Sequence, residues 1–575
     1  MAGGDYRAMR ADDQLLAGLG GVAGPGAGRV AVRNAALDGC HWMRQFLSWD
    51  GRRPRRTFIA IHFLIAIKAR LLMSIPNLLP APVAAEIMAD ADITTAIERL
   101  FTTQKGMNEH LLDVTTHEGL VTLAGFTDNL LARQRAEEIA LAVRGVRDVT
   151  NAVIVQVPDL SDADLQRDVC AALADDPATA DYNVQATAAD GVVTLSGMVQ
   201  SWAEKQLVLR VLQGVRGVTT FITEHLTIQK GTIVNSDEEI TTQIQELLDW
   251  DIRVNSALVE VRTNEHVVHL AGTVGTATEK DHIIAIAYQT GATRVDARDL
   301  FVAYWALSSE LRRGKFAPRA DEAIAAAVHG ALHRNPRVRC SEMLVQVHEG
   351  IVTLAGTVSN LRAHGEAERA VRHVVGVYDV HNLLKIRIKR LVPDADIRQT
   401  ILGALVRDPY VGHFFFTVTV RHGQATVHGQ VGNSMERERA GEVAAGVSGV
   451  LAVVNLVQQL DGTQADEFPA SQPGAAEPRP VGPDPDHALA GRIRQRYFWS
   501  ASLHDQAIEV QVRHSRATLT GTVDTWPERQ QAALDAYGAG ARDVNNHLRV
   551  LAPAATATPA PPPPQNPKPL VHALH

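Results

Sequence analysis

Two His-Glu pairs are the first residues in this sequence whose types could do chemistry. His117-Glu118 and His348-Glu349 match the start of the H-E-x-x-H zinc motif, in which two histidines one helical turn apart bind the metal and the glutamate acts as a base. The second histidine is missing, because Val121 and Val352 occupy its position. Both pairs also fall where the pattern predicts a turn between strands rather than a helix. We therefore expect no zinc site at either pair.

Motifs for phosphate binding and nucleophilic catalysis are also incomplete. Gly314-Lys315 lacks the upstream spacing and the following Ser or Thr of a P-loop. Gly18-x-Gly20-x-x-Ala23 lies in a Gly-rich stretch with no strand before it, which a dinucleotide-binding turn would need. There is no G-x-S-x-G, and the 23 histidines are scattered, so we interpret them as surface and turn residues. The sequence predicts no catalytic residue, no cofactor-binding residue, no metal ligand and no enzyme.

The three cysteines, Cys40, Cys170 and Cys340, form neither a C-x-x-C pair nor an even set. Their spacing therefore indicates neither a disulfide framework nor a zinc site. Cys170 lies beside Val169 and near Leu173 on an apolar helical stripe, where we expect a buried thiol.

Composition describes a soluble globular protein of several domains, with 575 residues, 46% hydrophobic and 21% charged. The net charge of −8 is spread unevenly. Residues 1–87 carry 11 Lys and Arg against 6 Asp and Glu (+5), so the remainder carries 45 against 58 (−13). Because binding to phosphate backbones needs a basic face, this acidic body argues against nucleic acid as the main partner.

A short strand pattern that ends in glycine recurs six times along the chain. The six copies are VTLAG at 121–125, VTLSG at 193–197, VHLAG at 268–272, VTLAG at 352–356, ATVHG at 425–429 and ATLTG at 517–521. The glycines are 72, 75, 84, 73 and 92 residues apart. Apolar and polar residues alternate as in a strand with one buried face, and the glycine is typical of a bulge or a close backbone approach.

Each copy is surrounded by the same elements. A helix with apolar residues three or four apart comes first, and it breaks near Pro177, Pro336 and Pro409 in copies two, four and five. A strand then leads through a turn into the repeated strand, with turn glycines at Gly119, Gly191, Gly350 and Gly423. In copies three and six the turns are Asn264-Glu265-His266 and His514-Ser515-Arg516, without glycine, so we expect those units to be less stable or differently turned.

A second helix and a last strand complete the unit. Capping-box chemistry predicts the helix start in four copies: Ser201-x-x-Glu204, Thr276-x-x-Glu279, Asn433-x-x-Glu436 and Thr525-x-x-Glu528. We expect the helix to end at a glycine: Gly145, Gly217, Gly291, Gly376, Gly449 and Gly540. The last strand repeats an asparagine at Asn151, Asn382, Asn455 and Asn546, whereas copy three has Ala297. The unit is predicted to be an α+β two-layer module, a three-stranded sheet with two helices on one face.

This pattern, G-V-V-T-L-x-G-x-V with a G-V-x-x-V-x-N-x-L closing strand, resembles the BON family of bacterial osmotic-stress and nodulation domains. The similarity is greatest at Gly191–Val199 and Gly350–Val358. The resemblance implies six tandem αββαβ modules, arranged as beads on a string, and a non-catalytic multivalent protein. The implied partner is a phospholipid membrane surface, and protein partners are a second expectation. The implied role is in the response to osmotic or envelope stress. The alternative is a cytoplasmic scaffold or a protein that binds a small ligand or an ion such as potassium.

The repeats are expected at 89–158, 160–230, 235–304, 318–390, 392–460 and 486–551. A Pro/Gly-rich linker covers 461–485 and a Pro-rich tail covers 552–575. Residues 1–88 hold Arg52–Arg56 before an apolar run at Phe58–Ile67, too late for a signal peptide and too short for a span. Two interpretations stay open, a membrane anchor or a translation start at Met88. The location is cytoplasmic under the second, and periplasmic or membrane-associated otherwise.

Copy four carries the most basic stretch of the array, Lys385–Arg390. We interpret it as a closing strand with outward charges. The mixed charges of its second helix, Arg362 to Arg372, are typical of a solvated helix face rather than a lipid-binding one.

Overall fold

The computed structural model describes residues 88–103, 112–156, 160–229, 235–312, 314–338, 343–388, 391–459 and 485–550. The predictions for Arg52–Ile67, Cys40, Cys340 and the Pro-rich tail lie outside these residues.

Modules one to three follow one order of elements, helix–strand–strand–helix–strand. Module one has α3 (Asp90–Thr103), β1 (Leu112–His117), β2 (Leu120–Thr127), α4 (Leu130–Leu141), β3 (Asp148–Asn151) and β4 (Ile154–Val155). Module two has α5 (Asp162–Asp175), β5 (Asn183–Ala189), β6 (Val192–Val199), α6 (Trp202–Gln213) and β7 (Thr220–Ile228). Module three has α7 (Asp237–Trp250), η3 (Ser256–Leu258), β8 (Val259–Asn264), β9 (Val267–Val274), α8 (Ala277–Gln289), β10 (Arg294–Val302) and η4 (Tyr304–Leu307).

Modules four to six repeat this order after the short helix α9 (Ser309–Arg312). Module four has α10 (Asp321–Arg334), β11 (Met343–His348), β12 (Ile351–Val358), α11 (Leu361–Arg372) and β13 (Asp379–Ile386). Module five has α12 (Asp394–Arg407), β14 (Phe416–Arg421), β15 (Gln424–Val431), α13 (Ser434–Ala445) and β16 (Ala452–Gln459). Module six has α14 (Pro485–Trp499), β17 (Ala507–Arg513), β18 (Arg516–Val523), α15 (Trp526–Gly538), β19 (Asp543–Asn546) and β20 (Arg549–Val550).

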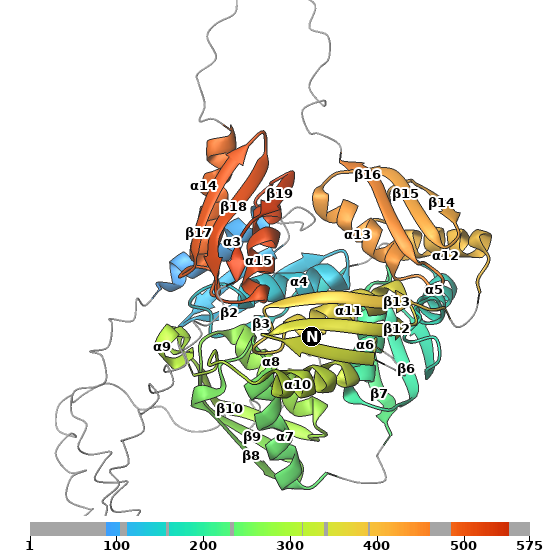
Figure 1. The fold of residues 1–575 in the computed structure, drawn as a ribbon. Coiled ribbons are helices and arrows are strands. Elements are labelled where there is room, and N and C mark those ends of the chain that lie inside the picture. The colour runs from blue at the N-terminus through green and yellow to red at the C-terminus, as the bar shows by residue number, and fades with distance from the viewer. Residues whose placement is uncertain are drawn as a thin grey trace, which may run out of the picture. The chain divides into compact units, whose positions relative to one another are not determined.

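In every module the repeated strand lies in the centre of the sheet. It pairs antiparallel with the strand before it and parallel with the strand after the second helix, as β12 does with β11 and β13. Both helices lie on one face of the sheet, which is clearest for α12 and α13 beside β14–β16 in Figure 1. The predicted α+β two-layer class is confirmed.

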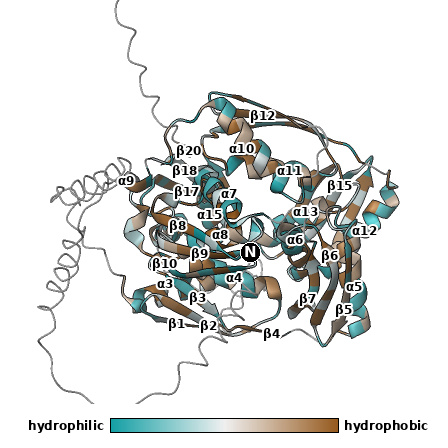
Figure 2. Cartoon of the chain, turned by 90° about the horizontal axis from the view of Figure 1, so that it is seen from below, coloured by the Kyte–Doolittle hydropathy of each residue, from teal (hydrophilic) through white to brown (hydrophobic). Residues whose placement is uncertain are grey.

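The core is made by one stripe of the first helix, the inward residues of the sheet and buried residues of the second helix, such as Ala440 and Ala444 in module five. In module five the stripe is Ile397, Ile401 and Leu405, all buried, and it packs with Val418 and Val427. Apolar and polar residues alternate along the strands in Figure 2, because successive side chains point to opposite faces.

The prediction of a buried Cys170 was wrong, because its side chain is exposed. The buried stripe of α5 is Leu165, Val169 and Leu173. Cys170 follows Val169 by one residue, and one residue turns a helix by about 100°. This rotation takes the thiol off the stripe.

Helix ends follow the predicted breaks only in part. The first helices α5, α10 and α12 end two residues before Pro177, Pro336 and Pro409. The second helices end two to four residues before the predicted glycines. These glycines have φ of +87° to +105°, so they follow the helix and reverse the chain after it rather than ending it.

The repeated strand glycine marks a close backbone approach. At Gly197 a side chain would overlap the carbonyl oxygen of Asn183 on the neighbouring strand, and φ is +125°. Five of the six glycines share this left-handed backbone. In module five Gly429 lies outside that region, and a Cβ there would come 2.7 Å from a ring atom of Phe416.

All six hairpin turns have the same backbone. Both central residues have φ between +50° and +78°, the pattern of a type I′ turn. His266 and Ser515 adopt it in modules three and six, although neither is glycine. The expectation that these two turns differ was therefore wrong, whereas their lower stability stays a prediction.

The modules also contact one another, which the beads-on-a-string expectation did not include. An antiparallel bridge joins Val143 of module one to Ser500 of module six, and a second joins Asp251 of module three to Val374 of module four. Each joins the end of a first helix to the end of a second helix. Modules two and five make the matching hydrogen bond, from Arg216 N to the Arg407 oxygen at 2.8 Å. The second backbone hydrogen bond of such a bridge is missing between modules two and five, because its donor would be the backbone N–H of residue 409, and Pro409 has no N–H.

Candidate functional site

Among the described residues, no three His, Cys, Asp or Glu side chains gather closely enough to hold a metal ion. No helix in the same ranges is long and apolar enough to cross a membrane. His117 and His348 each end a first strand, and Glu118 and Glu349 occupy the left-handed turn that follows. The His-Glu pairs therefore lie on hairpin turns, as the sequence predicted.

An aspartate at the start of each first helix holds the hairpin turn. Its carboxylate accepts hydrogen bonds of 2.7–3.1 Å from the turn's backbone N–H groups; the residues are Asp90, Asp162, Asp237, Asp321, Asp394 and Asp486. These bonds favour the charged carboxylate and lower the pKa of Asp90, Asp394 and Asp486 below its usual value. The contact is part of the module's fold.

The repeated asparagine ties the last strand to the second helix. In module four Asn382 Nδ2 donates to the carbonyl oxygen of His364 at 3.0 Å, and Asn382 Oδ1 accepts from Leu384 N at 3.3 Å. Asn151, Asn455 and Asn546 make the same two bonds. Modules two and three lack this asparagine, and only their last strands shift register against the central strand. The asparagine is therefore also structural.

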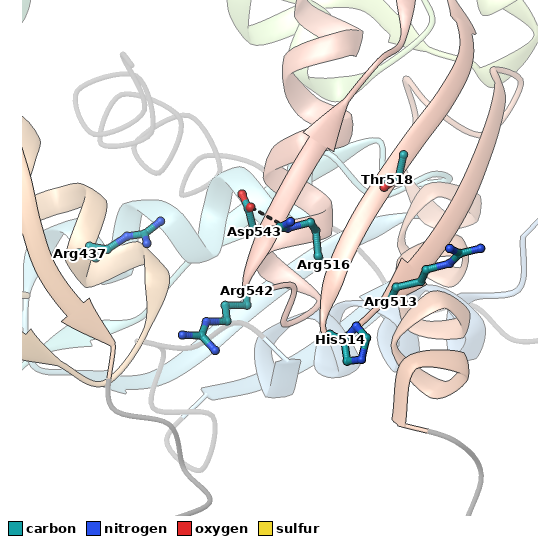
Figure 3. A pocket seen from close by; sticks show the side chains of 7 residues that line it. All are labelled: Arg437, Arg513, His514, Arg516, Thr518, Arg542 and Asp543. Atoms are coloured by element: carbon teal, nitrogen blue, oxygen red, sulfur yellow. Dashed lines mark ion pairs between the residues drawn. The ribbon is translucent and has the colours of Figure 1, made fainter.

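Two surfaces differ from module to module and are therefore not explained by the shared fold. The clearest is a pocket of about 670 Å³ at the hairpin end of module six. Arg513 and His514 line it from the end of β17 and the turn, Arg516 and Thr518 from β18, and Arg542 and Asp543 from the start of the last strand. Arg437 of α13 in module five completes it (Figure 3).

These side chains gather because the hairpin turn lies beside the start of the last strand. Arg542 N donates to the carbonyl oxygen of Ser515 at 2.8 Å, and Arg513 lies opposite Arg516 in the strand ladder. Arg516 forms an ion pair with Asp543, with Nε 3.0 Å from Oδ2. The other carboxylate at this turn, Asp486, accepts from the backbone of His514 and Ser515. The pocket lining is thus strongly basic.

A second distinctive surface is the outer face of the module-four sheet. Leu344 and Leu383 lie on either side of Ala355 in one row across the three strands. Their exposed fractions are 56% and 61%, which is high for leucine. In the other five modules the first residue of this row is polar: Asp113, Gln185, Glu260, Thr417 and Glu509.

Basic residues border this row on the edge strand. Lys385 and Arg387 follow Leu383 at alternate positions and are exposed, as expected for a closing strand with outward charges. Lys389 and Arg390 lie outside the described residues. The predicted solvated face of α11 is only partly solvated. Arg372 forms an ion pair with Glu368 at 2.6 Å, and its guanidinium group stacks over Trp526 of module six.

A comparison with protein families finds the BON domain six times, at 89–157, 161–230, 236–298, 320–388, 393–461 and 485–552. These matches cover most of the chain. The chain belongs to the BON domain family. Osmotically-inducible protein Y of Escherichia coli K12 is 30% identical over 146 residues, which are 24% of this chain and 72% of that relative.

Two solved structures of the type III secretion structural protein CdsD of Chlamydia trachomatis are also similar to parts of this BON chain. They are 16% and 17% identical, each over 40% of this chain and 98% or 100% of the solved chain, with TM-scores of 0.12 and 0.11.

Sequence reasoning missed two features of these BON modules. The aspartate contact had a readable signal, because each aspartate precedes the first turn residue by 28 positions. The arginine cluster had no comparable signal. Arg513 and Arg542 are far apart in sequence, and only the strand pairing brings them together.

Proposed function

We propose that this chain is a non-catalytic, multivalent BON-repeat protein that associates with phospholipid membrane surfaces in osmotic or envelope stress. Membership of the BON family and the similarity to an osmotically inducible protein support the stress role. Several weak modules on one chain raise the effective concentration of each at a surface, so their affinities reinforce one another.

The observation that carries the membrane proposal is the outer face of module four. A membrane surface offers an apolar layer beneath a negatively charged one, and this face presents Leu344 and Leu383 next to Lys385 and Arg387. Single exposed leucines are ordinary on protein surfaces. Two in one row, bordered by two cations, match both layers of a bilayer surface.

Co-sedimentation of the full chain with vesicles tests this proposal. We expect binding to vesicles that contain phosphatidylglycerol, weaker binding to pure phosphatidylcholine, and a decrease with added salt because salt screens exposed charges. The double variant Leu344→Ser/Leu383→Ser should lose most of the binding. Leu456→Ser is the matched control, since Leu456 occupies the position of Leu383 in module five and is 49% exposed.

Equal binding by the wild-type chain and the module-four variant would contradict the proposal. Loss of binding in the Leu456→Ser control to the same extent would contradict the assignment of membrane contact to the module-four face.

The alternative is a scaffold or small-ligand-binding stress protein. The observation that favours it is the arginine-lined pocket of module six. Such a lining repels potassium and other cations, so under this alternative the ligand is an anion.

A further inference from the structure

We propose that the pocket of module six is a binding site for a phosphate-bearing anion. It is separate from the outer face of module four, and neither proposal depends on the other. The ligand would bind between the hairpin turn and the start of the last strand, against Arg513, Arg516 and Arg542 (Figure 3).

The fold of the module does not require these arginines. The paired positions of Arg513 and Arg516 hold His117 and Leu120, Ala189 and Val192, Asn264 and Val267, His348 and Ile351, and Arg421 and Gln424 in the other modules. The position of Arg542 holds Arg147, Thr219, Thr293, Tyr378 and Leu451, and its backbone bond to the turn is made in all six. Module six alone combines three arginines on one BON scaffold.

The arrangement also places like charges side by side, with the Arg516–Asp543 ion pair as a partial offset. Arg513 and Arg516 lie directly opposite each other in an antiparallel ladder, where like charges repel. Asp543 is the one acidic group lining the pocket, against the four arginines and His514. A bound anion would replace this repulsion by attraction, so the cluster is better explained by a ligand than by folding.

The chemistry of the lining selects phosphate among the anions. Guanidinium groups present planar pairs of N–H donors that match phosphate oxygens. Arg513 and Arg542 extend to opposite sides of Arg516 in Figure 3, so a bound phosphate group would draw these long, exposed side chains toward itself. The Thr518 hydroxyl adds a donor or acceptor on the same side. The volume of about 670 Å³ falls within the usual range for small-ligand sites, so a group larger than one phosphate fits.

Calorimetric titration of the full chain with inorganic tripolyphosphate tests the site. We expect saturable binding that weakens as salt is added. The double variant Arg513→Gln/Arg516→Gln should bind at least about tenfold more weakly, because it removes two charge-assisted contacts. Arg542→Gln alone should weaken binding less.

Arg421→Gln is the matched control, because Arg421 occupies the position of Arg513 in module five and does not line the pocket. It should bind tripolyphosphate as the wild type does. All of these side chains are exposed, so circular dichroism should show unchanged folding.

The same variants added to phosphatidylglycerol vesicles identify the source of the phosphate. Loss of tripolyphosphate binding with vesicle binding kept supports a soluble ligand, and loss of vesicle binding in the pocket variants supports a lipid headgroup. Unchanged binding of both probes by the pocket variants, or an equal loss in Arg421→Gln, would overturn the proposal. Leu344→Ser/Leu383→Ser should leave tripolyphosphate binding intact, so failure of one proposal is distinguishable from failure of the other.

Discussion

Asn382 illustrates how single polar residues hold a BON module together. Its amide group bridges α11 and β13, donating to the His364 carbonyl and accepting from Leu384 N. Modules without this residue insert one more residue at the same point, opposite Leu195 in β6 and opposite Leu270 in β9. At the point where the last strand runs along the second helix, four modules therefore use the asparagine side chain, and modules two and three use a bulge.

Replacing this asparagine should loosen its own module. In Asn382→Ala the His364 carbonyl and the Leu384 amide lose their partner, which costs about 1–3 kcal/mol for partly buried groups. Hydrogen exchange measured by mass spectrometry should be faster in α11 and β13 and unchanged in module five. Thr353→Ala, on the outer face of the same sheet, is the control. Equally fast exchange in both variants would contradict the assignment.

At the scale of elements, Lys315, in the segment between modules three and four, caps the C-terminal end of helix α7. Lys315 Nζ donates to the carbonyl oxygen of Leu248 at 2.7 Å and to that of Val254. Carbonyls at a helix C-terminus are unpaired and carry partial negative charge, which a cation stabilises. Burial nevertheless lowers the pKa of Lys315 from 10.5 to about 8 despite the nearby Asp249 and Asp251 carboxylates.

This shift predicts a pH dependence of stability. Between pH 8 and 10.5 the unfolded chain holds the proton that the folded chain has lost, so the free energy of unfolding should rise with pH across this window. Urea unfolding from pH 8 to 9.5 should show a smaller rise in Lys315→Met than in the wild type. The measurement stops at pH 9.5 because burial raises the pKa of Tyr410 and Tyr378. Above pH 10 these tyrosines lose their protons more readily in the unfolded chain, which lowers the free energy of unfolding as pH rises. The same rise in Lys315→Met would contradict this role.

At the scale of the whole molecule, contacts between modules far apart in sequence add to the tandem order. Asp176 of module two and Arg337 of module four form an ion pair at 2.9 Å, and both side chains are only 7% exposed. Arg362, also of module four, lies 3.5 Å from the same carboxylate. Together with the bridge between Val143 of module one and Ser500 of module six, this pair joins modules that are not neighbours in the sequence.

Breaking this pair tests whether the modules depend on one another. Arg337→Met should destabilise the chain by about 3 kcal/mol, at the lower end for a broken buried pair because Arg362 remains beside Asp176. Adding Asp176→Asn should recover part of the loss, since no buried carboxylate is then left without Arg337. Arg167→Met, in the exposed pair with Asp164, should change stability by less than about 1 kcal/mol. Additive losses at Asp176 and Arg337 would show that the two do not interact.

The sequence by itself determined the module. Alternation along strands, turn residues and helix caps act within a few residues, so their signals lie in short windows. Thr276 and Thr525 form the predicted capping boxes in full. Ser201 caps as predicted, although Glu204 accepts from Gln200 N instead of the cap residue. Asn129 and Asn360 cap without the glutamate on which the prediction relied.

Only the tertiary structure decided what differs between the modules. The exposure of Cys170 depends on the side of α5 that meets the sheet, and the row of Leu344 and Leu383 depends on a register between distant strands. Arg513 and Arg542 become neighbours because β18 pairs with both β17 and β19. Contacts of this kind depend on strand register and on the length of the connection between strands. Both are set over tens of residues, so they produce no periodic pattern that can be read from one sequence.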